Sequence, residues 1–96
     1  MKMLMLVYSG ADSARISSML DDCGAGGYTE FQGVHGVGST GRREGSRAWP
    51  GRSTLFVSVV PAADAGRLFE SFRDESTRLP AGERLHVAVL PTESFF

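Results

Sequence analysis

Cysteine, net charge and long apolar runs are all scarce in this chain of 96 residues. A single cysteine, Cys23, excludes an internal disulfide and favours a cytoplasmic protein. No apolar run approaches the ~20 residues that a membrane-spanning helix needs, so membrane insertion is not expected. The short apolar start, MKMLMLVY, has no small-residue cleavage site after it and is a poor signal peptide. Ten basic and eleven acidic side chains give a formal net charge of −1, which argues against general affinity for nucleic acid.

The motifs of common catalytic sites are also missing. The chain has no G-x-x-x-x-G-K-[ST] phosphate loop, and its G-V-G at residues 36–38 is by itself a weak dinucleotide signal. Ser, His and Asp are not grouped as in a catalytic triad, and Cys23 has no evident activating base. We therefore expect a binding protein and not an enzyme.

Glycine and arginine are instead concentrated in residues 33–52, GVHGVGSTGRREGSRAWPGR. This segment holds six glycines and four arginines with one acid. It cannot bury enough apolar surface to offset the entropy of ordering, so a flexible loop is expected over residues 34–52. Its guanidinium groups suit phosphate or carboxylate, and Trp49 adds an apolar anchor. The segment predicts a binding loop for a small anion or an acidic partner, with a solvated hairpin connection as the alternative.

The two halves of the chain repeat one order of predicted elements, strand, helix, strand. Apolar runs rich in β-branched residues indicate the strands. One helix is expected to begin at Asp12 or Ser13 and another directly after Pro61. The four expected strands are residues 2–9, 28–33, 54–60 and 85–90.

Each expected helix carries one apolar stripe with the spacing i, i+3, i+4 and i+7. The stripes are Ile16, Met19, Leu20 and Cys23 in the first helix, and Ala65, Leu68, Phe69 and Phe72 in the second. Two one-sided helices on one sheet face predict an α+β fold, a ferredoxin-like β-α-β-β-α-β sandwich spanning residues 1–96 as one domain. Its other sheet face has no helix to cover it, and Met3, Met5, Phe56 and Val87 include residues that need burial on one face or the other. An uncovered apolar face favours a homo-oligomer over a monomer.

Short motifs follow one another in a specific order along residues 1–91. They are TEFQG at residues 29–33, GRREG at 41–45, FVSVVP at 56–61, and PAGER at 80–84 followed by VLP at 89–91. The first three are similar to a T-E-V-K-G strand end, a G-R-Q-K-G loop and an I-V-V-P-D-D strand-to-helix junction. The last resembles a glycine turn with its V-L-P strand. In this order the motifs resemble those of the nitrogen-regulatory PII signalling proteins.

The resemblance implies a homotrimer with small-molecule sites in the clefts between subunits. There, amides of the loop base and of the second glycine turn cradle the phosphates of ATP or ADP, as glycine-rich nests do. The large loop then docks on a target protein, such as a transporter or a metabolic enzyme. The residues carried over as binding this small anionic effector are Gly36, Gly38, Gly41, Arg42, Arg43, Gly82 and Arg84.

The chain departs from the family pattern at three places. After V-L-P the family carries arginines that clamp phosphates, whereas residues 92–96, TESFF, supply none and add an acid. The family's second turn reads close to G-D-G-K, whereas residues 81–84 read AGER, so that Arg84 stands in the position of a lysine. The loop also lacks the tyrosine that some family members modify, so control by uridylylation is not expected.

A metal-binding trimer resembling the copper-tolerance proteins of the same fold is the alternative. His35 and His86 are the only histidines, and isolated histidines are more often structural than metal ligands. His35 is the better candidate ligand because it lies at the base of the loop.

Overall fold

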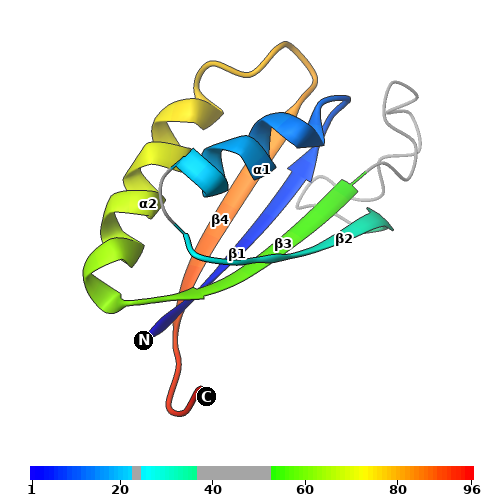
Figure 1. The fold of residues 1–96 in the computed structure, drawn as a ribbon. Helices are drawn as coiled ribbons and strands as arrows, with labels where there is room; N and C mark the ends of the chain where they lie inside the picture. Colours follow the sequence, from blue (N-terminus) through cyan, green and yellow to red (C-terminus); the bar gives the residue numbers. More distant parts are fainter. Residues whose placement is uncertain (23–24, 37–52) are drawn as a thin grey trace.

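The chain folds into a four-stranded antiparallel sheet with two helices on one of its faces (Figure 1). The structure is a computed structural model that describes residues 1–22, 25–36 and 53–96. The strands lie in the order β2-β3-β1-β4. The β-α-β-β-α-β sandwich expected from the sequence is therefore confirmed. The elements are β1 (Lys2–Ser9), α1 (Ser13–Asp22), β2 (Thr29–Val34), β3 (Ser53–Val60), α2 (Ala62–Ser76) and β4 (Arg84–Pro91).

The core lies between the helices and one face of the sheet. Side chains alternate between the two faces of a strand, so Leu4, Leu6 and Tyr8 of β1 all point to the helices, and all three are fully buried. Phe56 of β3 lies next to Leu6 in the register and packs against the ring of Tyr28, with ring centroids 6.1 Å apart. The other buried hydrophobic residues are Ile16, Leu20, Ala25, Val60, Ala65, Leu68, Phe72 and Leu85.

Helix α2 buries a face slightly rotated from the expected one. Ala65, Leu68 and Phe72 are buried as predicted, but Phe69 is only half-buried, so its assignment to the core is wrong. The fourth buried position is Glu75, whose carboxylate pairs with Arg15 of α1 and with Arg78, at 3.4 Å from the latter. This ionic link between the helices allows Glu75 to be buried, which moves the buried face away from Phe69.

Helix α1 follows its predicted stripe as far as the structure describes it. Ile16 and Leu20 are buried, and Met19 packs against the core. Cys23, the fourth member of the stripe, lies outside the described residues.

Most of the strand ends differ from the predicted ends by one residue. Strand β2 also contains a bulge. Gly33 does not end this strand, which continues to Val34. The register with β3 shifts between Phe31 and Val34, and Gly33 has a φ of +70°. A bulge needs one residue of unusual backbone conformation, and glycine adopts it without steric cost.

The second face of the sheet, here called the outer face, is apolar and has neither helix over it (Figure 1). By register it carries Met3, Met5 and Val7 of β1 beside Val59, Val57 and Leu55 of β3. Phe31 of β2 is 48% exposed and Leu90 of β4 is 38% exposed on the same face. This face is the one that the sequence predicts to need covering by another chain.

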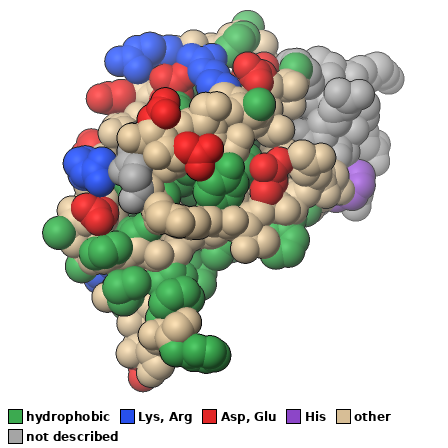
Figure 2. Space-filling model, viewed as in Figure 1, with side chains coloured by type: hydrophobic (Ala, Val, Ile, Leu, Met, Phe, Trp, Pro, Cys, Tyr) green, Lys and Arg blue, Asp and Glu red, His purple; other side chains and the backbone are tan. Residues whose placement is uncertain are grey.

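Charged side chains of both signs are interspersed over the helices (Figure 2). The view shows no large area of one sign there, as expected for a chain of net charge −1. None of the helices in the described part of the chain has the length and apolarity needed to cross a membrane.

Candidate anion site at one end of the sheet

The strand register brings two of the predicted binding segments to one end of the sheet. Val34 at the end of β2 pairs with Ser53, Ser53 pairs with Ser9, and Ser9 pairs with Arg84 at the start of β4. These four residues form one row across all four strands. Gly36 lies two residues beyond this row on one side, and Gly82 lies two residues before it on the other.

The two segments nevertheless lie at opposite edges of the sheet within one chain. β2 and β4 are the two edge strands, three inter-strand spacings apart. Each spacing is about 4.8 Å, so the loop base and the second glycine turn are separated by roughly 14 Å across the sheet. One chain therefore aligns the candidate residues at one end without closing them into a compact site.

The second glycine turn (residues 80–84) is fixed by its backbone. Gly82 has a φ of +88°, and the Glu83 amide donates a hydrogen bond to the Pro80 carbonyl at 3.1 Å. A non-glycine residue would be strained at such a φ. Arg84 follows at the first position of β4, exposed, and its register partner Ser9 places it on the outer face.

Gly36 is exposed and has open space around it. A Cβ atom added there would meet nothing within 4 Å. Packing against the described residues therefore does not require glycine at this position. The remaining predicted site residues, Gly38, Gly41, Arg42 and Arg43, lie outside the described residues.

The two histidines lie at opposite edges of the sheet. His35 directly follows β2, whereas His86 belongs to β4, where it is exposed and pairs with Val7. Within residues 1–22, 25–36 and 53–96, no three His, Cys, Asp or Glu side chains are grouped so that they could hold a metal ion. The structure therefore does not bring His35 and His86 together as ligands of one metal.

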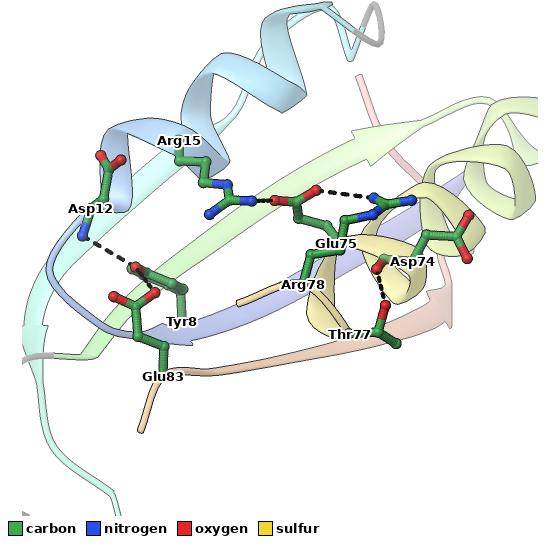
Figure 3. A network of polar contacts seen from close by, with 8 residues as sticks. All are labelled: Tyr8, Asp12, Arg15, Asp74, Glu75, Thr77, Arg78 and Glu83. Atoms are coloured by element: carbon green, nitrogen blue, oxygen red, sulfur yellow. Dashed lines mark hydrogen bonds and ion pairs between the residues drawn. The ribbon is translucent and has the colours of Figure 1, made fainter. Parts of the chain in front are cut away.

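A buried tyrosine, which the sequence analysis did not single out, connects the second glycine turn to the end of β1 (Figure 3). The Tyr8 hydroxyl donates a hydrogen bond to Glu83 Oε1 at 2.7 Å and accepts one from the Asp12 amide at 3.1 Å. The pKa of Tyr8 is raised from 10.0 to about 12, mainly by burial of the hydroxyl and next by its hydrogen bond to Glu83. The sequence signal was the inward position of Tyr8 in an apolar strand, because a buried hydroxyl needs a partner.

Stability at alkaline pH is expected to depend on Tyr8. The folded chain holds the Tyr8 proton more tightly than the unfolded chain, so this contribution is complete below pH 10 and is lost as the pH rises to about 12. Denaturant unfolding from about pH 9 to about pH 12 measures it against Tyr8→Phe, which lacks the titrating group. The unaltered chain should lose more stability over this range than the variant. Parallel losses in the two proteins would contradict the role of Tyr8.

The structure is similar to solved PII-like proteins over nearly its whole length. No protein-family model and no curated protein matches the sequence. CPII from Thiomonas intermedia K12, a nitrogen regulatory PII-like protein solved with ADP, AMP and bicarbonate, has a TM-score of 0.65 at 23% identity, covering 94% of this chain and 93% of that one. The same protein bound to ADP and bicarbonate gives 0.66 at 26% identity, covering 93% and 84%.

A putative PII-like signalling protein from Thermus thermophilus has a TM-score of 0.63 at 20% identity, covering 93% of this chain and 84% of that one. The sequence motifs and the structure thus agree with each other. The four-stranded antiparallel sheet with two helices on one face matches the fold of these proteins. The chain has the fold of the PII-like nitrogen regulatory proteins, as a divergent example of it.

Proposed function

We propose that this chain is a PII-like regulatory protein that binds a small anionic effector, ADP or ATP or a similar nucleotide, between the subunits of a homotrimer. Residues 34–52 carry the signal to a target protein, such as a transporter or a metabolic enzyme in the cytoplasm. The proposed role is regulation by binding, without catalysis. The observation that carries the proposal is the alignment of Gly36 with Gly82 and Arg84 at one end of the sheet.

The position of these residues on opposite edge strands supports a site formed by two chains. In a head-to-tail ring of identical chains, two different surfaces of each subunit meet at every interface, so one sheet edge of a subunit can face the other edge of the next. The loop base after β2 of one chain then meets Arg84 at the start of β4 of its neighbour. Positive charge and free glycine amides converge on one anion in that arrangement.

The nucleotide assignment is supported by the similar structures. CPII, which shares the fold, was solved with ADP, AMP and bicarbonate. The exposed Arg84 and the positive φ of Gly82 give this chain a cation and a preformed turn at one end of its sheet. A phosphate group is a suitable partner for both.

Assembly into a trimer is the first expected result. The outer face with Met3, Met5 and Val57 loses contact with water when three chains pack together, and burial of apolar area stabilises association. Light scattering at tens of micromolar should report a species near three times the chain mass of 10.3 kDa. A strictly monomeric species at that concentration would refute the trimer.

Calorimetric titration tests the binding function. ADP, ATP, bicarbonate and Cu(II) or Zn(II) are titrated separately into the full chain at fixed ionic strength. The proposal expects saturable heat when a nucleotide is titrated. It expects the heat of the metal titration to be the same with and without nucleotide present. Binding of metal alone, lost in His35→Ala, would replace the proposal with the metal-binding alternative, and no heat from millimolar nucleotide would refute it.

A further inference from the structure

Glu83 places an acidic side chain next to the cation of the proposed site. It is the only acid in the second glycine turn (residues 80–84), and it directly precedes Arg84. A carboxylate free to approach the anion would repel it and would compete for the Arg84 guanidinium. A chain that binds anions here must hold this carboxylate elsewhere.

The structure shows where the carboxylate is held. Glu83 Oε1 accepts the 2.7 Å hydrogen bond from Tyr8 (Figure 3). The other carboxylate oxygen, Oε2, lies 3.4 Å from the Ala11 amide. Tyr8 belongs to the helix-facing side of β1, whereas Arg84 is on the outer face. The Glu83 carboxylate and Arg84 are therefore directed to different sides of the sheet.

Gly10 makes this contact sterically possible. A Cβ atom on Gly10 would lie 2.3 Å from the Tyr8 hydroxyl oxygen and 2.7 Å from Cδ of Glu83. Any larger residue at position 10 would occupy the space in which these two side chains meet. The Tyr8–Glu83 contact is thus supported by three segments of the chain: the end of β1, the turn at residues 10–12 and the second glycine turn.

We infer that Tyr8 is a positioning residue of the anion site: by hydrogen bonding to Glu83 it holds the acidic side chain of the second glycine turn away from the anion bound at Arg84. The inference rests on the proposed function, because it concerns the affinity of that same site. The ligand of this site is the phosphate-bearing effector. Tyr8 contributes by keeping one local negative charge, that of Glu83, away from it.

A rescue experiment tests the inference. Tyr8→Phe removes the shorter of the two hydrogen bonds that hold the Glu83 carboxylate, so the affinity for ADP should fall by about three- to ten-fold. Glu83→Gln removes the charge, and the double variant Tyr8→Phe/Glu83→Gln should bind ADP as well as the unaltered chain does. Tyr28→Phe, which removes the other tyrosine hydroxyl of the chain, is the control and should bind unchanged. Circular dichroism and light scattering establish that each variant is folded and assembled.

Hydrogen exchange provides a readout that needs no ligand. The amides of Ala11 and Asp12 donate to Glu83 and Tyr8, so Tyr8→Phe should speed their exchange. If Tyr8→Phe weakens ADP binding and the added Glu83→Gln change does not restore it, the role of Tyr8 is purely structural. That result would overturn the inference. Unchanged affinity in Tyr8→Phe would also overturn it while leaving the proposed function intact. Absence of ADP binding in the unaltered chain would overturn both.

Discussion

Replacing Phe72 with alanine is expected to lower the free energy of unfolding by about 3–5 kcal/mol. Phe72 is fully buried on the face of α2 that packs against the sheet, so truncation removes a large apolar side chain and leaves a cavity. Leu20→Ala on α1, where the side chain is likewise fully buried, should cost about 2–5 kcal/mol. Urea unfolding monitored by circular dichroism measures both losses.

Phe69→Ala is the matched control for Phe72→Ala. Both are phenylalanines on α2, but Phe69 is only half-buried. Its truncation should cost clearly less than that of Phe72, because less apolar surface is lost from the core. Equal losses at the two positions would contradict the face of α2 that the structure assigns to the core.

Replacing Arg84 with alanine is expected to weaken nucleotide binding by about ten- to a hundred-fold. Arg84 is the exposed cation directly after the second glycine turn, and a charge-assisted hydrogen bond contributes about 1.5–3 kcal/mol. Arg84→Lys should recover only part of the loss, because an ammonium group cannot make the two parallel bonds of a guanidinium. Calorimetric titration with ADP gives the dissociation constants.

Arg73→Ala is the control for Arg84→Ala. Arg73 is an exposed arginine near the end of α2, paired with Glu70 at 3.9 Å, and its removal changes the net charge by the same amount. Its variant should bind ADP like the unaltered chain. A similar loss in the two variants would mean that overall charge, and not a local contact at Arg84, determines affinity.

Periodicity was sufficient to predict the elements of the fold. The stripe of Ile16 and Leu20 in α1 is buried as predicted, whereas the continuous apolar run at residues 2–9 predicts a strand without indicating which of its side chains face the helices. Phe69 was assigned to the core because a stripe defines a face only to within about one residue of rotation. The buried position of Glu75 depends on Arg15 of another helix, and no local pattern indicates such a pair.

The candidate site was predictable in part. Two glycine-bearing segments could be identified from motifs, and their common end of the sheet follows from an antiparallel register. The Tyr8–Glu83 contact could not be predicted, because it joins residues 75 positions apart through a turn conformation that depends on Gly82. The separation of Gly36 from Arg84 across the sheet likewise depends on strand order, which motifs do not give.

Subunit complementation tests the central claim, a site shared by two chains, most directly. Arg84→Ala removes the cation from one side of the proposed site. Gly36→Glu adds a negative charge to the other side at a position with room for a side chain. Each variant alone should bind ADP weakly. When the two are unfolded, mixed in equal amounts and refolded together, about a quarter of the interfaces should join an unaltered Gly36 to an unaltered Arg84. The account predicts that the mixture regains this fraction of sites at the affinity of the unaltered chain, whereas a mixture as weak as its components would contradict it.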